Sequence, residues 1–170
     1  EIERLPNLAA SIAMIRDGFH DDNQGGTVEL RDNGEPLLDY PVNEYLLDGT
    51  KRAHLTMLEM QFADGAKEVR PSHADAGYYK SWKAAREGVA QLDYAPVITG
   101  LGSAHVMGGL TMGADESRCT VNSDGSYKHL NGLYIIDGSV FPTSIGANPQ
   151  LSIYGLSARN ASALADKLKA

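Results

Sequence analysis

Residues 131–168 have the sequence NGLYIIDGSVFPTSIGANPQLSIYGLSARNASALADKL. The apolar run at residues 133–136, bounded by Asn-Gly and Asp-Gly pairs, is typical of a short buried strand followed by a turn. A loop of small residues follows. Asn148 and Pro149 then predict a helix start, because asparagine is a favoured N-cap and proline a favoured first helical residue. Apolar residues recur at roughly helical spacing as far as Leu168, so the stretch predicts a strand, a loop and a helix N-terminus.

That helix N-terminus would offer free backbone N–H groups and a partial positive charge, which stabilise an anion or an electron-rich carbonyl. A second glycine-rich turn lies in HVMGGLTMG, residues 105–113. His105 therefore begins one glycine-rich turn, and Asn148 ends the other, the loop of small residues that leads into the helix. A histidine, with an ordinary pKa of about 6.5, can take a proton near neutral pH, and an asparagine amide can orient a substrate oxygen. The pairing suggests redox chemistry on an alcohol, which needs a base at the hydroxyl group.

The two stretches resemble the C-terminal end of the glucose-methanol-choline (GMC) family of flavin-dependent oxidoreductases. An H-x-x-G-[GT] segment supplies the catalytic histidine of that family, and His105, Gly108 and Gly109 match it. A G-L-x-[IV]-x-D-[GA]-S-x-x-P strand and turn supplies flavin contacts, and residues 132–142 match it. The second polar group of the family stands at the next helix start, where this chain has Asn148.

The resemblance is strong over roughly residues 100–168. Within it, the sequence differs from the commoner H-P-x-G-T-x-x-M-G motif at Val106 and Gly109. It implies that His105 is the base that removes the hydroxyl proton while hydride passes to N5 of FAD. It also implies that the amide of Asn148 binds the substrate oxygen and fixes its orientation. The residues that it assigns to the cofactor, through side chains or nearby backbone N–H groups, are Asp137, Gly138, Asn148, Pro149 and Gln150.

The sequence has no G-x-G-x-x-G strand, turn and helix, the fingerprint that holds the pyrophosphate of FAD. We therefore expect a C-terminal fragment whose partner is a missing N-terminal FAD-binding part of the same chain. By itself the fragment is expected to bind FAD weakly or not at all. Residues 1–130, with the histidine segment at 103–113, are expected to belong to the substrate domain. Residues 131–170 are expected to return to the FAD-binding domain and complete it.

The remaining pattern predicts an α+β fold, with a mainly antiparallel sheet that carries helices on one face. A hairpin is expected from residues 26–30 and 36–42, around the turn Asn33-Gly34. Asn43 is expected to cap a helix that ends at about Ala63. The other expected elements are a helix at 76–90, strands at 66–70, 93–99 and 101–107, and a strand at 8–15 whose alanines also allow a helix.

Composition excludes several other classes of protein. The 170 residues are 42% hydrophobic with a formal net charge of -7, which is enough for one core and ordinary for a soluble chain. Lysines and arginines are scattered, so nucleic acid is not an expected partner. The single cysteine, Cys119, excludes a disulfide framework and a multi-cysteine zinc site, and no metal role is expected for Asp115 and Glu116. No apolar run approaches the roughly 18 to 20 residues of a membrane span.

The expected substrate is an alcohol of partly apolar character. This expectation rests on the residues that are candidates to line a pocket, which are Met57, Met60, Phe62, Tyr94 and Met107. The four other histidines lack ligand-like spacing, and surface or structural roles are expected for His20, His54, His73 and His129.

Two other functions compete with alcohol oxidation. A stand-alone binding or interaction domain would keep the fold without the redox chemistry. Such a domain would have no physical reason to retain His105 and Asn148 in their family positions. A hydrolase with Ser103 or Ser139 as its nucleophile ranks last, because the chain has no G-x-S-x-G elbow.

Overall fold

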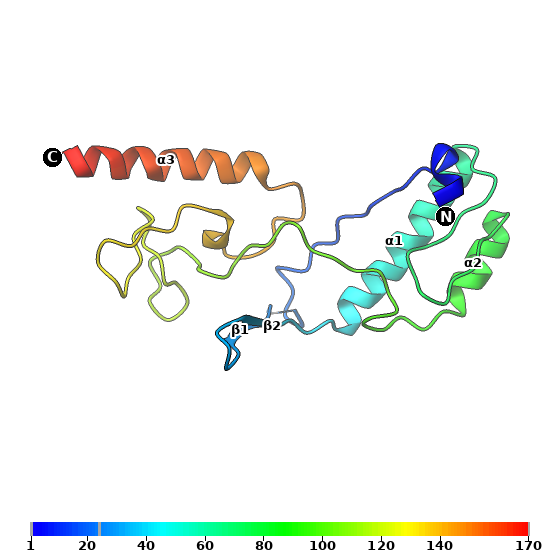
Figure 1. The fold of residues 1–170 in the computed structure, drawn as a ribbon, viewed down its shortest axis with the longest axis horizontal. Helices are drawn as coiled ribbons and strands as arrows, with labels where there is room; N and C mark the ends of the chain where they lie inside the picture. The colour runs from blue at the N-terminus through cyan, green and yellow to red at the C-terminus, as the bar shows by residue number, and fades with distance from the viewer. Residues whose placement is uncertain (1, 24, 170) are drawn as a thin grey trace. The chain divides into compact units, whose positions relative to one another are not determined.

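The computed structural model describes residues 2–23 and 25–169, and Figure 1 labels their helices and strands. The described chain divides into two compact units. The first unit comprises residues 2–15 and 25–101, and the second comprises residues 16–23 and 102–169. Each unit buries side chains of its own. Those of the first include Leu58, Val69, Ala85 and Val89, and those of the second include Val121, Val140 and Asn160.

The first unit contains the β-hairpin that the sequence predicted. Strand β1, Thr27–Leu30, pairs antiparallel with β2, Pro36–Asp39. In the turn between them, Gly34 has a φ of 81°, a left-handed conformation that glycine adopts without steric cost. Its N–H donates to the carbonyl of Arg31 (2.8 Å). Every residue of both strands is exposed, so the hairpin is held by its turn and its ladder rather than by a core.

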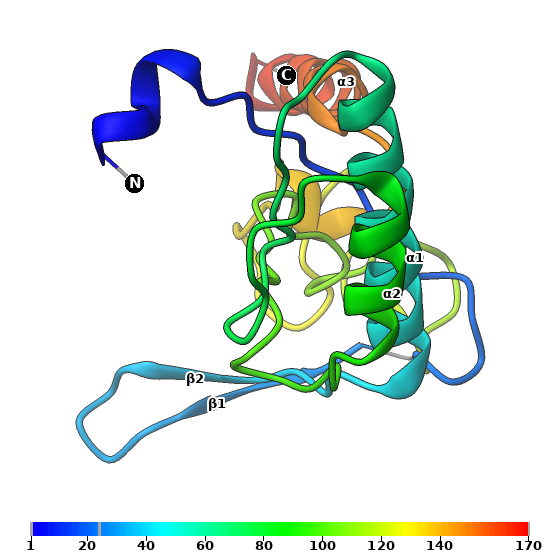
Figure 2. The same ribbon diagram turned by 90° about the vertical axis from the view of Figure 1, so that its right-hand side faces the viewer.

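Two helices supply the core of the first unit. Helix α1, Glu44–Ala63, begins after Asn43, whose side-chain oxygen accepts a backbone N–H of the first turn (3.1 Å), as predicted. Helix α2, Trp82–Ala90, is capped in the same way by Ser81 (3.2 Å). The two helices run side by side (Figure 2). The buried cluster to which both contribute consists of Leu58, Val69, Ala85 and Val89.

The helix expected at residues 76–90 is shorter than predicted and begins at Trp82. Glycine disfavours helix at Gly77, and the cap at Ser81 serves only the later start. Tyr79 instead bridges to Val69 through two backbone hydrogen bonds of 2.9 and 2.8 Å. Tyr79 and Trp82 pack against the core cluster.

The α+β class is confirmed, but the large antiparallel sheet expected from the sequence is reduced to the hairpin, whose strand residues are exposed instead of covered by helices. Residues 8–15 follow a 3₁₀ helix, η1 (Ile2–Asn7), and are irregular. A strand persists only where a neighbour pairs with several of its residues. Two of the expected strands contribute a single bridge each, at Val69 and Thr99, and 101–107 forms no strand.

The second unit consists of loops, a short 3₁₀ helix and one long helix. The 3₁₀ helix η2 is Gly138–Val140, and helix α3 is Gln150–Lys169. The strand predicted at residues 133–136 is replaced by one isolated bridge, between Ser126 and Tyr134. Turn pairs on both sides confine this segment to a few residues, which is too short for a ladder without a long neighbouring strand.

Polar contacts anchor the middle of α3. Asn160 is 1% exposed, and Arg159 Nη1 donates to its Oδ1 (2.8 Å) and to the carbonyl of Ser123 (3.0 Å). The hydroxyl of Ser157 donates to the carbonyl of Ile136 (3.1 Å). No helix in the described ranges, α3 included, combines the length and the apolar character needed to cross a membrane.

Two buried histidines and a half-buried tyrosine form a cluster in the first unit. His54 and His73 are each 4% exposed, and both rings contact that of Tyr94, with centroids 5.7 and 5.3 Å apart. The Tyr94 hydroxyl hydrogen-bonds His54 Nδ1 (2.9 Å), and burial raises the pKa of Tyr94 to about 12. His73 Nε2 pairs with the carbonyl of Asp93 (2.9 Å), while its Nδ1 accepts from Asp75 N–H (3.2 Å). Both histidines therefore serve the structure of this unit.

We expect the first unit to lose stability as the pH falls below about 6.5. Burial, and secondly the neighbouring His73, lowers the pKa of His54 in the folded chain. The unfolded chain then binds this proton more tightly, so the stabilisation is complete above the unfolded pKa and is lost as the pH falls through the folded pKa. Trp82, the chain's single tryptophan, packs on the core, so its fluorescence reports urea unfolding of this unit.

The urea midpoint is expected to be lower at about pH 5 than at about pH 7.5. His54→Gln is expected to reduce this difference, because glutamine does not titrate. His129→Gln, at an exposed histidine of the other unit, is the control and is expected to leave it unchanged. If the urea midpoint of the His54→Gln chain depended on pH as strongly as that of the unsubstituted chain, His54 would not be the group responsible for the pH dependence.

Candidate active site

The histidine segment, residues 105–113, lies against η2 within the second unit. Leu110 N–H donates to the carbonyl of Ser139 (3.0 Å), and Met112 N–H donates to the carbonyl of Val140 (3.0 Å). Both bonds join backbone to backbone, so they do not depend on side-chain rotamers. They hold the predicted base-bearing segment beside the turn that was predicted to contact the cofactor.

Gly138 is the point where three predicted motifs meet. A Cβ at Gly138 would stand 3.0 Å from Cδ1 of Ile153 and 3.4 Å from the carbonyl oxygen of Val106. Val106 directly follows His105, and Ile153 lies in the first turn of α3, shortly after Asn148. The second unit therefore brings together the histidine segment, the Asp-Gly-Ser turn and the helix start.

The carboxylate of Asp137 closes the turn at η2. Its Oδ1 accepts from the N–H (2.8 Å) and the hydroxyl (2.5 Å) of Ser139. The same Asp-Gly-Ser turn occurs at Asp124, whose Oδ1 accepts from the N–H (3.0 Å) and the hydroxyl (2.6 Å) of Ser126. Because one turn chemistry explains both aspartates, the residue type at Asp137 does not by itself mark a cofactor contact. That role stays a prediction, and the side chain is exposed.

Helix α3 begins one residue later than predicted. Its first hydrogen bond runs from Ile153 N–H to the carbonyl of Pro149 (2.9 Å), so Pro149 occupies the N-cap position and Gln150 is the first helical residue. Pro149 is buried, whereas Asn148 and Gln150 are exposed. Asn148 thus stands outside the helix, at the end of the loop that leads into it.

The start of α3 fits an electron-rich group such as the pyrimidine edge of a flavin. The helix has 20 residues, and its aligned peptide dipoles place a partial positive charge at the N-terminus. The N–H groups of the first turn have no acceptor within the helix. Gln150 and Leu151 are exposed there, and so are His105 and Asn148. The residues present therefore suit the cofactor that the resemblance implies.

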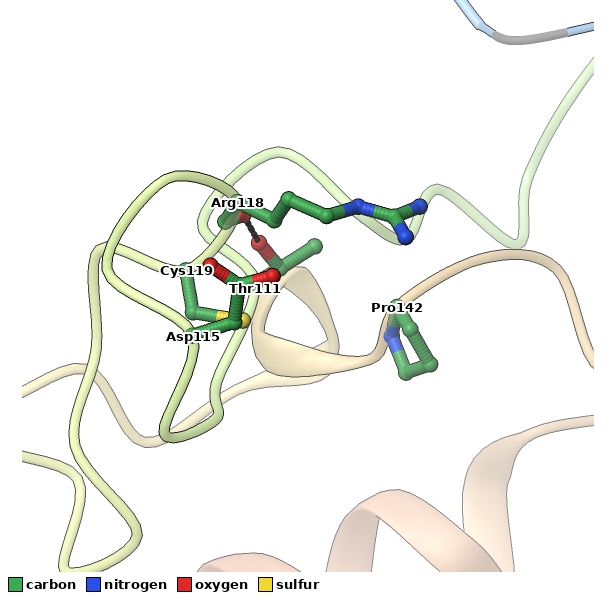
Figure 3. A pocket seen from close by; sticks show the side chains of 5 residues that line it. All are labelled: Thr111, Asp115, Arg118, Cys119 and Pro142. Atoms are coloured by element: carbon green, nitrogen blue, oxygen red, sulfur yellow. Dashed lines mark hydrogen bonds between the residues drawn. The ribbon is translucent and has the colours of Figure 1, made fainter.

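Two hollows on the second unit contain neither His105 nor Asn148. The first, of about 290 Å³, is shown in Figure 3 and is lined by Thr111, Asp115, Arg118, Cys119 and Pro142. The hydroxyl of Thr111 donates a hydrogen bond to the carbonyl of Arg118 (2.6 Å), another residue that lines this hollow (Figure 3). The second, of about 450 Å³, is lined by Glu116, Asn122, Lys128 and His129. Neither hollow places a predicted catalytic residue in its wall.

Core packing accounts for part of the predicted apolar lining. Phe62 and Tyr94 pack against the core cluster of the first unit, and Met60 on α1 is 65% exposed. Met107 lies in the histidine segment of the second unit and is half-buried. Of the five residues in that prediction, Met107 is therefore the one that shares a segment with His105.

Sequence reasoning missed the contribution of residues 16–23 to the second unit. This segment joins that unit although the rest of the unit begins at residue 102. Gly18 lies in close contact with Thr143, far along the chain. A glycine in a polar stretch was the one available signal, and it does not reveal its partner.

The sequence is similar to several known proteins. Residues 22–157 match the family described as GMC oxidoreductase. A GMC-type oxidoreductase of Mycobacterium tuberculosis, described as uncharacterised, is 28% identical over 155 residues, which cover 91% of this chain and 23% of that protein. A long-chain-alcohol oxidase of Arabidopsis thaliana is 28% identical over 127 residues, 66% of this chain and 17% of that protein. A 6'''-hydroxyparomomycin C oxidase of Streptomyces lividus is 36% identical over 69 residues, 41% of this chain and 13% of that protein.

Proposed function

Because the chain belongs to the GMC oxidoreductase family, as its C-terminal motifs predicted, we propose that it is the catalytic C-terminal part of an FAD-dependent oxidoreductase acting on an alcohol. The family match over residues 22–157 draws on both units. The chain spans 23% or less of the length of the relatives described above. In this proposal FAD is held mainly by residues of the protein outside this chain.

The junction at Gly138 carries the proposal. Alcohol oxidation needs a base at the hydroxyl oxygen and an acceptor facing the carbon, so the groups that serve each must lie close together. The segment after His105, the turn at Asp137 and the first turn of α3 all pack at this glycine. Such an arrangement supports a site in which the base and the cofactor-facing groups share one wall.

His105 is proposed to take the hydroxyl proton, and Asn148 to orient the substrate oxygen. The His105 side chain is exposed, while the bonds of Leu110 and Met112 to η2 hold its segment in place. An asparagine amide does not titrate in the working range of pH. Its contribution is therefore a hydrogen bond that fixes geometry rather than a proton transfer.

When bound, FAD supplies the acceptor for the hydride. The N-terminus of α3, which follows the buried Pro149 and begins at the exposed Gln150, is proposed to face the electron-rich edge of FAD, where free N–H groups and the helix dipole favour negative charge. Asp137 and Gly138 are proposed to contact the ribityl chain of FAD. The Asp137 carboxylate is exposed and fixed by Ser139, so it presents acceptor atoms in one orientation.

The proposed substrate class is an alcohol with an apolar portion. Two relatives are oxidases by name, and the name of one specifies long-chain alcohols. Met107 offers an apolar, half-buried side chain two residues from the proposed base. An apolar portion of the substrate would pack beside it while the hydroxyl group reaches His105.

Flavin retention tests the proposal. We expect the full-length protein that contains this chain to keep FAD through dialysis, and the 170-residue chain alone to keep little or none, because the pyrophosphate-binding fingerprint is absent from it. The flavin absorbance per protein measures both. Stoichiometric FAD on the chain alone would contradict the proposed division of the cofactor site. A full-length protein that stays free of flavin after incubation with FAD would contradict FAD dependence and favour a binding module.

A further inference from the structure

We propose that residues 16–23, here called the strap, hold the loop that leads to Asn148, and that Arg16 and Gly18 are positioning residues for this side chain. The strap and the loop, residues 142–148, belong to the same compact unit. The role of Asn148 rests on the proposed function. The packing of the strap on the loop is a property of the chain itself.

Gly18 makes the first contact. A Cβ at Gly18 would stand 1.7 Å from Oγ1 of Thr143, 2.9 Å from its Cβ and 3.2 Å from the backbone nitrogen of Ser144. Contacts under 3.0 Å are essentially never made by real Cβ atoms, so only glycine fits here. The next residue, Phe19, has a φ of 59°, a conformation that a non-glycine residue keeps only where its surroundings fix it. The strap therefore turns sharply where it meets the loop.

Gly146 makes the reciprocal contact. Its φ is 68°, and a Cβ there would stand 2.8, 3.0 and 3.1 Å from Cδ, Cβ and Cγ of Arg16. The aliphatic stem of Arg16 thus covers this glycine. Each segment places one side chain over a glycine of the other, Thr143 over Gly18 and Arg16 over Gly146. Two such contacts fix both the position and the direction of the loop.

The histidine segment holds the same loop at a further point. Gly108 has a φ of 87°, and a Cβ there would stand 3.6 Å from the carbonyl oxygen of Pro142 and 3.8 Å from Cα of Thr143. Thr143 is therefore close both to the strap and to the segment that begins at His105. Through this residue, the strap sets how the loop that ends at Asn148 lies against the segment that carries the base.

Accurate placement of Asn148 matters for the proposed chemistry. A hydrogen bond that orients the substrate oxygen works only where the reacting atoms are aligned, and a displacement of about 1 Å costs on the order of 100-fold in rate. Asn148 follows Gly146 by two residues, so a change at the strap contact is transmitted over a short length of backbone. Loosening the strap is expected to slow the chemical step without removing the cofactor.

Backbone amide NMR of the 170-residue chain tests the packing without redox chemistry. Gly18→Ala is expected to shift or broaden the amide signals of residues 143–148. Gly102→Ala is the matched control, because a Cβ at Gly102 meets nothing within 4 Å and its φ is not in the left-handed region. Thr143→Ala, added to Gly18→Ala, removes the 1.7 Å clash with Oγ1 but keeps the 2.9 Å contact with Cβ, so it is expected to restore the signals of residues 144–148 in part.

Arg16→Ala tests the second contact without introducing a clash, so it decides the question even where Gly18→Ala fails to fold. It too is expected to move the signals of residues 143–148, because the stem that covers Gly146 is lost. Unchanged loop signals in the folded Arg16→Ala chain would overturn the strap.

Kinetics of the FAD-loaded full-length protein test the positioning role. Gly18→Ala is expected to lower kcat by about tenfold to hundredfold, with FAD content unchanged and KM changed far less. Thr143→Ala in the same chain is expected to recover part of the loss, and Gly102→Ala to leave kcat unchanged. Shifted loop signals with an unchanged kcat would overturn the positioning role. Shifted loop signals in a protein whose unsubstituted form oxidises no alcohol would support the strap and overturn the proposed function.

Discussion

Replacing His105 with alanine is expected to lower the rate of alcohol oxidation by about 10²- to 10⁴-fold in the FAD-loaded protein, the usual contribution of a general base. Alanine cannot take the hydroxyl proton, and the other groups of the site do not replace it. His105 is exposed, so the substitution removes little packing, and FAD content is expected to stay unchanged. The rate of flavin reduction in a single anaerobic turnover measures this step directly.

His129→Ala is the matched control for this experiment. His129 is an exposed histidine of the same unit, and its ring contacts Tyr127 (centroids 5.5 Å apart). It is expected to leave the rate of flavin reduction unchanged. A loss of less than about threefold for His105→Ala, with flavin still bound, would remove His105 from the mechanism.

Leu58→Ala is expected to lower the free energy of unfolding of the first unit by about 2–5 kcal/mol. Leu58 is 2% exposed and packs in a cluster with Val69, Ala85 and Val89. Truncation removes apolar contacts and leaves a cavity between α1 and α2 that the remaining side chains fill only in part. Urea unfolding followed by Trp82 fluorescence measures the change, because Trp82 packs against this cluster.

Met60→Ala serves as the control on the same helix. Met60 is 65% exposed, and alanine and methionine both favour helix, so the change is expected to stay within about 0.5 kcal/mol. Equal effects of the two substitutions would show that the α1 and α2 contact is not the core of this unit.

Local features of the fold could be predicted because their causes lie within a few residues. Asn43 caps α1 through its own side chain, and Gly34 adopts the left-handed conformation that the hairpin turn needs. Both contacts are made inside one turn of chain. The bounds of α1 and the position of the hairpin therefore followed from residue types alone.

The pairing of extended segments that lie far apart in the sequence could not be predicted. Residues 66–70 and 93–99 have the residue types of strands, yet they find one bridge each, to Tyr79 and His73. Whether an extended segment becomes a strand depends on a partner of matching length, which residue types do not specify. For the same reason the apolar run at 133–136 did not become a strand.

The candidate site was identified through the resemblance of two motifs, and the structure adds how they meet. Glycine letters in the sequence do not state which residues they approach, so neither the junction at Gly138 nor the contact of Gly18 with Thr143 could be predicted. The Asp-Gly-Ser turn shows that a correctly predicted local structure does not by itself identify a functional residue. It forms at Asp124 as well as at Asp137, so a motif correctly predicted a local structure that carries no function by itself.

Anaerobic mixing of the FAD-loaded full-length protein with a long-chain primary alcohol tests the central claim most directly. We expect the absorbance of the oxidised flavin to disappear in the unsubstituted protein, and to persist far longer in the His105→Ala variant. An absorbance that stays unchanged in the unsubstituted protein, with FAD bound and with primary and secondary alcohols of several lengths supplied, would contradict alcohol oxidation at this site.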